Sequence, residues 1–114
     1  MITDTAFIAA TDQVLAQIGR ALDDALAASD ADVDWTISEG ILEIECEDGG
    51  KVIVNRHAPN REIWVAAKSG GFHFRAEQGL WRDTRSGREL ATALADIVSA
   101  QAGVSVALPI LRAP

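Results

Sequence analysis

The fold of this chain is decided by residues 33–46, VDWTISEGILEIEC, in which apolar and polar side chains alternate on both sides of Glu39-Gly40. The apolar set is Val33, Trp35, Ile37, Leu42, Ile44 and Cys46. A period of two puts such a set on one face of a strand, and a short segment with glycine is typical of a hairpin turn. The stretch therefore predicts two antiparallel strands, each with one apolar and one polar face.

The pattern of short strands continues beyond this hairpin. A second turn is predicted at Asp48-Gly49-Gly50, and further strands are predicted at Val52 to Asn55, at about Glu62 to Lys68, around Phe72 and Phe74, and at Leu80 to Arg82. Pro59 and Gly70-Gly71 interrupt the series, because proline lacks the N–H that a ladder needs and glycine favours turns. The order predicts a meander of five to six antiparallel strands.

Helical periodicity flanks the strands on both sides. Apolar residues recur at three- and four-residue spacing from about Asp4 to about Ala28, which predicts an amphipathic helix. Ser86 and Glu89 fit a capping box that would begin a second helix, with Gly103 at its end. Two such helices are most easily buried on one face of the sheet. The predicted fold is an α+β, two-layer α-β sandwich in α-β-α order, with the other sheet face open.

The length of 114 residues suits a single domain covering residues 1–114, with a C-terminal tail at about 104–114. Three apolar residues of this tail, Leu108, Ile110 and Leu111, are predicted to lie in the groove between the two helices. Pro109 prevents the tail from simply continuing as a helix or a central strand.

Charge is distributed unevenly along the chain. Twelve of the seventeen acidic residues lie in the first fifty positions with one basic residue, Arg20, whereas the remainder has nine basic and five acidic residues. The net charge of −7 and the pI near 4.6 argue against binding to nucleic acid, whose phosphates would be repelled. A single cysteine excludes an internal disulfide, and no export or membrane-spanning segment is recognisable. We therefore expect a cytoplasmic protein that does not associate with membranes.

Several motifs, in this order and spacing, resemble the frataxin family and in particular its bacterial members. They are Asp12-Gln13, Leu22-Asp23-Asp24, Asn55-Arg56 with Pro59, Ile63-Trp64, Ser69 to Phe74, Trp81 and Arg85-Ser86-Gly87. The resemblance implies a protein without catalytic activity that weakly binds ferrous or ferric iron and takes part in iron–sulfur cluster assembly. It also implies partners, namely the cysteine desulfurase and the iron–sulfur scaffold proteins, and a monomer that can oligomerise with iron.

The resemblance further places iron on an acidic ridge, which in this chain would comprise Asp23, Asp24, Asp30, Asp32 and Asp34. The chain departs from the usual bacterial pattern at Gly19 and Arg20, where glutamates are typical, and by a small alanine-rich insertion around 25–28. Arg20 lies one helical turn from Asp23 and Asp24 and can neutralise part of their charge. We therefore expect weaker metal binding than is usual for the family.

The residues alone lead to a less specific interpretation of the ridge. Carboxylates without histidine or cysteine are hard oxygen ligands that suit ferrous iron, manganese, calcium or magnesium alike. The alternative is that these acids are simply solvated on a helix face and a strand edge. Asp30, Asp32 and Asp34 favour the metal site, because alternate strand residues point the same way and concentrate charge.

A second candidate surface lies on the open face of the sheet. Alternation places Ile63 and Val65 inside and Trp64 outside, where Asn55, His73 and Arg75 of neighbouring strands would join it. A large exposed aromatic residue is typical of a contact site, although Trp64 could also be core if the faces were reversed. Trp35 and Trp81 are predicted to be buried or half-buried, and Cys46 to be a buried small hydrophobic residue.

Two other classes of function stay open. One is an acidic protein–protein adaptor that binds no metal physiologically. The other is a small enzyme that uses His57 or His73, but neither histidine has a serine, cysteine or paired carboxylate at a spacing that would assemble a nucleophile or a metal triad. The sequence therefore predicts no catalytic residues.

Overall fold

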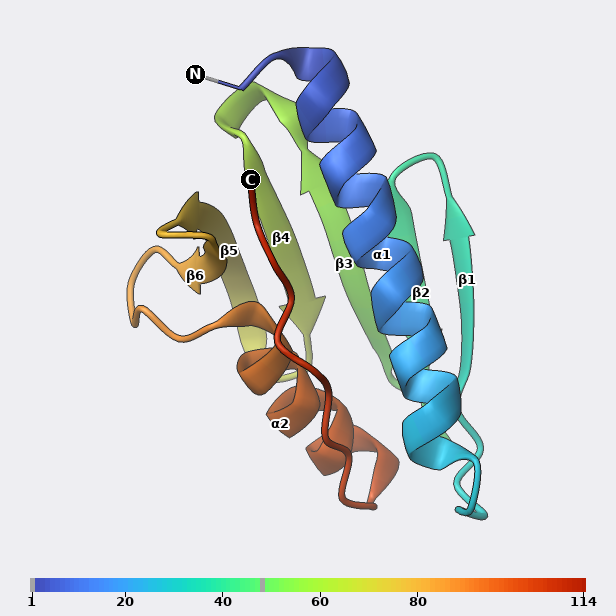
Figure 1. The fold of residues 1–114 in the computed structure, drawn as a ribbon. Coiled ribbons are helices and arrows are strands. Elements are labelled where there is room, and N and C mark those ends of the chain that lie inside the picture. Colours follow the sequence, from blue (N-terminus) through green and yellow to red (C-terminus); the bar gives the residue numbers. More distant parts are fainter. Residues whose placement is uncertain (1, 48) are drawn as a thin grey trace.

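A computed structural model describes residues 2–47 and 49–114 of the chain. The elements are α1 (Asp4–Leu26), β1 (Asp34–Ser38), β2 (Ile41–Glu45), β3 (Lys51–His57), a 3-10 turn η1 (Ala58–Asn60), β4 (Glu62–Ala67), β5 (Gly70–Glu77), β6 (Leu80–Asp83) and α2 (Leu90–Ala102). Both helices cover the same face of the sheet (Figure 1), which confirms the predicted two-layer α+β fold. The second predicted turn includes Asp48, which lies outside the described residues. No helix in the described part is long and apolar enough to cross a membrane.

The sheet is a simple antiparallel meander, with its six strands in the order β1-β2-β3-β4-β5-β6. The register pairs Trp35 with Ile44 and Ile37 with Leu42, so the apolar positions of the opening hairpin share one face. Leu42 and Ile44 are fully buried, whereas Ile37, on the edge strand, is 40% exposed. The predicted alternation is therefore confirmed, and burial is lost only at the edge of the sheet.

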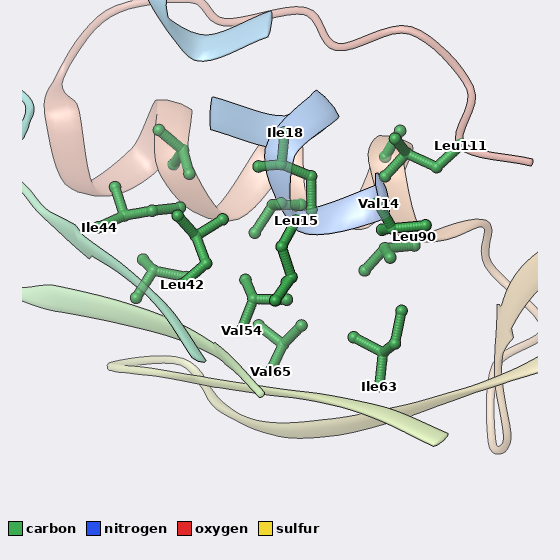
Figure 2. Close-up of a cluster of buried hydrophobic side chains, with 14 of the residues drawn as sticks. Val14, Leu15, Ile18, Leu42, Ile44, Val54, Ile63, Val65, Leu90 and Leu111 are labelled. Atoms are coloured by element: carbon green, nitrogen blue, oxygen red, sulfur yellow. The ribbon is translucent and has the colours of Figure 1, made fainter. Parts of the chain in front are cut away.

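The core lies between the helices and the inner face of the sheet. Leu15 and Ile18 of α1 meet Leu42, Val54 and Val65 of the sheet in this cluster (Figure 2), and each of the five is at most 2% exposed. Side chains of this size each contribute about 1.5–3 kcal/mol when fully buried. The apolar face of α1 thus fixes which face of the sheet stays open.

One of the motifs behind the resemblance joins the sheet to α1. Arg56 of β3 donates from Nη1 to Asp12 Oδ1 at 2.6 Å and so ties the sheet to the helix. The guanidinium lies against Gly40, where an added Cβ would approach it to 2.6 Å. Gly40 also has a φ of +80°, which a residue with a side chain rarely adopts. The turn glycine therefore leaves room for the ion pair.

The start of α2 differs from the prediction. The capping box with Ser86 as N-cap is wrong: the N-cap is Glu89, whose carboxylate accepts from the N–H groups of Ala91 and Thr92 at 2.8 and 3.0 Å. Residues 84–87 form a turn instead, closed by hydrogen bonds between the backbones of Asp83 and Arg88 and of Gly87 and Asp83. The helix starts later because the N–H of Gly87 and the C=O of Arg88 already form hydrogen bonds within this turn and cannot take part in a first helical turn.

The C-terminal tail runs between the two helices (Figure 1), which confirms its predicted course. Leu111 is 2% exposed and its N–H donates to Glu89 Oε2 at 3.2 Å, so one buried carboxylate holds both α2 and the tail. Leu108 is half-buried. Ile110 is 57% exposed, so its predicted burial is wrong. Its neighbour Leu111 is the residue that turns inward.

Candidate functional site: an acidic ridge and an aromatic cluster

The acidic ridge consists of Asp23 and Asp24 in the last turn of α1, Asp30 and Asp32 in the connection, and Asp34 at the start of β1. All five side chains are exposed. The last turn of α1 contains no basic residue, and the C-terminal end of a helix carries a partial negative charge. The helix end and the carboxylates therefore both make the electrostatic potential of this region negative, which favours the binding of a cation.

The packing of Trp35 against α1 joins the ridge to the fold. Trp35 Nε1 donates to Asp23 Oδ1 at 2.9 Å, and the indole ring lies over Gly19. A Cβ at Gly19 would lie 2.7–2.9 Å from three carbons of this ring, closer than real contacts allow. Gly19, which the sequence presents as a missing glutamate, is thus the residue that lets β1 approach α1.

The geometry of the ridge is open. Within residues 2–47 and 49–114, no three histidine, cysteine or acidic side chains converge closely enough to hold a metal ion. Arg20 is exposed and forms no ion pair with any described residue, although the sequence suggested that it could neutralise its acidic neighbours. An ion at the ridge would be held by carboxylates that also face water.

The aromatic cluster occupies the open face of the sheet, where we define it as His57, Glu62, Trp64, His73 and Arg75. Trp64 is half-buried, and its ring is stacked between His57 and His73, with centroid distances of 3.7 and 4.2 Å and interplanar angles of 9° and 7°. The register that pairs Asn55 with Trp64, and Trp64 with His73, brings the predicted residues together. Trp64 therefore lies on the open face, as predicted, with both faces of its ring covered by imidazoles.

A buried carboxylate fixes this cluster. Glu62 is 3% exposed, and it accepts from Trp64 Nε1 at 2.8 Å and from Arg75 Nη2 at 2.6 Å. His73 Nδ1 lies 3.8 Å from Glu62 Oε1. Burial by itself would raise the pKa of Glu62, but the hydrogen bonds from Trp64 and Arg75 and the charge of Arg75 lower the pKa below its ordinary value. Glu62 therefore stays ionised and orients the indole.

Sequence reasoning identified four residues of this surface, Asn55, Trp64, His73 and Arg75, and missed two. Glu62 falls on the polar side of its strand, which gives no sign of burial, and the sequence presents His57 only as a candidate residue of a small enzyme and not as part of this surface. The pairing of Glu62 with Arg75 on one side and His57 on the other could have been inferred once the strand register was known. Cys46 and Trp81 are buried and Trp35 is half-buried, as predicted.

Comparison with known proteins defines the class to which this fold and these surfaces belong. The model of the frataxin-like domain matches residues 1–104, and the chain belongs to this family. Its relatives include the iron-sulfur cluster assembly proteins CyaY of Cupriavidus metallidurans, 46% identical over 94% of this chain and 96% of that protein, and of Dechloromonas aromatica, 49% identical over 92% and 97%.

Solved structures agree with this assignment. Frataxin from Psychromonas ingrahamii has a TM-score of 0.78 and 31% identity, covering 93% of this chain and 97% of that one. Trimeric frataxin from the yeast Saccharomyces cerevisiae, complexed with ferrous iron, has a TM-score of 0.72 and 27% identity, covering 82% and 86%. The predicted family and fold are therefore both confirmed.

Proposed function

We propose that this protein is a non-catalytic component of iron–sulfur cluster assembly in the cytoplasm that carries iron at the acidic ridge. The observation that carries the proposal is the gathering of five exposed carboxylates around the C-terminal end of α1 in a chain of this family. The names of its relatives, and the ferrous complex of the yeast protein, support it. Iron is the cargo in this function.

The open geometry of the ridge sets the expected mode of binding. Solvated carboxylates provide no enclosed cage, so ferrous iron should bind weakly and exchange readily. Oxygen ligands of this kind also accept calcium or manganese, and these ions should compete. Such a site suits transient delivery of iron better than storage of it.

The ridge is also proposed to dock on the cysteine desulfurase. Exposed charges mainly raise the rate of encounter with an oppositely charged surface, and their effect falls as salt screens them. The aromatic cluster, with Asn55 beside it, would form the second contact, toward the desulfurase or the scaffold proteins. Because Trp64 is already held in place, little side-chain entropy remains to be lost when a partner binds.

An anaerobic titration followed by NMR tests the metal site. Ferrous ions should perturb the backbone resonances of Asp23, Asp24, Asp30, Asp32 and Asp34, and leave those of the aromatic cluster unchanged. Arg20→Glu should strengthen binding, because it adds an acidic side chain one turn before Asp23 and Asp24. If neither this substitution nor Asp32→Asn with Asp34→Asn alters the binding curve, iron does not bind at the ridge.

One observation favours a second candidate, an acidic adaptor without physiological metal binding. The ridge carboxylates do not converge into a three-ligand cluster among the described residues. Binding to purified desulfurase at two salt concentrations, with and without iron, distinguishes the two. Binding that depends on salt but is the same with and without iron supports the adaptor. Binding whose affinity changes with iron supports the iron-carrying component.

A further inference from the structure

A cavity is lined by residues from the start of the chain and α1, from β5 and β6, and from the end of the tail. Its volume is about 400 Å³, within the range of small-molecule sites. Its walls are mainly apolar, and they include Ile2, Phe7, Ala76 and Trp81. Beneath it, Phe7 and Trp81 meet edge to face with centroids 6.2 Å apart, and at 1% and 0% exposure they belong to the core under the cavity.

Two arginines, Arg61 and Arg75, line the same cavity. The guanidinium of Arg61 is held in place by an ion pair with Asp4, by a hydrogen bond to the carbonyl of Ala58, and by the ring of Phe7 at 5.6 Å from its Cζ. Arg75 donates from Nη2 to Glu62 Oε2, and among residues 2–47 and 49–114 its side chain has no other hydrogen-bond partner. The cationic side chains are therefore positioned by the fold before any ligand arrives.

The cavity residues carry unused hydrogen-bond donors. In the described part of the chain, four buried side-chain polar atoms have no partner, and two of them, Arg61 Nε and Trp81 Nε1, belong to residues that line this cavity. Both groups can only donate. Leaving a buried donor unpaired is unfavourable, so an acceptor at this place would be stabilising.

We infer that the cavity binds a small organic carboxylate with an apolar body. The carboxylate would accept from Arg61, with Arg75 as a further donor, while the body lies against Ile2 and Ala76, above the buried pair of Phe7 and Trp81. A monoanion suits the site better than phosphate, because Asp4 and Glu62 already neutralise part of the arginine charge. A cation or a ligand without an acceptor would leave the donors unsatisfied.

Benzoate is a suitable probe, and benzyl alcohol of nearly equal size is its uncharged control. The three indole N–H resonances can be assigned with Trp35→Phe and Trp64→Phe, which leave that of Trp81. Benzoate should shift the Trp81 resonance saturably at millimolar concentration and leave that of Trp35 unchanged, whereas benzyl alcohol should shift neither. Arg61→Gln should raise the Kd for benzoate at least about five-fold, as loss of a charge-assisted hydrogen bond does.

Arg88→Gln is the matched control, since Arg88 pairs with Asp96 outside this cavity and its loss should not change the Kd. Should Arg61→Gln unfold the protein, Arg61→Lys keeps the charge, removes the Nε donor and should still weaken binding. An unsaturable Trp81 shift, an equal shift with benzyl alcohol or with sodium chloride, or an Arg61→Lys variant with unchanged Kd would overturn the inference. An NMR signal that shows the Trp81 indole N–H in contact with a bound water, unchanged when benzoate is added, would also overturn the inference.

Discussion

The carboxylates of the acidic ridge and of the aromatic cluster differ in solvent exposure and in hydrogen bonding. On the ridge, five aspartates face water, and within the described part of the chain only Asp23 has a hydrogen bond to another side chain. In the cluster, Glu62 is buried and accepts hydrogen bonds from Trp64 and Arg75. An exposed carboxylate can be shared with an ion or a partner at little cost, but a buried one is part of the fold. The ridge therefore suits reversible binding of an ion or a partner, whereas the cluster holds its side chains in a fixed arrangement.

The largest expected effect comes from removing the buried carboxylate. Glu62→Ala should lower the free energy of unfolding by about 1–3 kcal/mol, because it leaves the indole N–H of Trp64 and the guanidinium of Arg75 without their acceptor. Chemical denaturation followed by circular dichroism measures this change. Glu77→Ala, an exposed glutamate on β5, is the control and should change stability little. Equal stability of both variants would mean that the cluster is not fixed by Glu62.

A smaller loss is expected where the ridge joins the fold. Gly19→Ala should destabilise the protein by about 1–2 kcal/mol, because overpacking against Trp35 outweighs the gain of about 1 kcal/mol in helix propensity. The substitution should also shift the indole resonance of Trp35, whose N–H donates to Asp23. Thermal denaturation and one NMR spectrum measure both effects. A more stable Gly19→Ala protein would show that Trp35 moves aside freely.

The two surfaces also differ in how far the sequence predicted them. Period-two alternation placed Trp64 outside and Leu42 inside correctly, because side-chain direction along a strand is a local property. The burial of Glu62 could not be predicted in this way, since its cover comes from Arg75 on the next strand and from Trp64. The same limit applies to Ser86, which fits a local capping motif but is overridden by the turn between Asp83 and Arg88. The face on which a side chain lies was thus predictable, whereas the hydrogen bonds that bury Glu62 and the turn that displaces the Ser86 cap were not.

Acid should distinguish the cluster from the ridge. Because the pKa of Glu62 is lowered in the folded state, its stabilisation is present above its ordinary pKa of 4.5 and is lost as pH falls through the lower, folded value. The stability difference between the wild type and Glu62→Gln should therefore be constant near neutral pH and shrink below about pH 4.5. Denaturation at several pH values measures the difference. A difference that grows on acidification would mean that Glu62 is protonated in the fold.

The smallest effect on stability is expected from the ridge, although its effect on binding should be large. Asp32→Asn with Asp34→Asn should change the free energy of unfolding by no more than about 0.5 kcal/mol, because neither side chain has a partner among the described residues. Association with the desulfurase at low salt should nevertheless slow, since fewer charges steer the encounter. Stopped-flow kinetics at two salt concentrations, alongside thermal denaturation, measures both. Asp96→Asn serves as the control, because it removes one exposed negative charge on α2, away from the ridge. If the ridge variant unfolds at clearly lower temperature, its carboxylates are structural and the contrast with Glu62 fails.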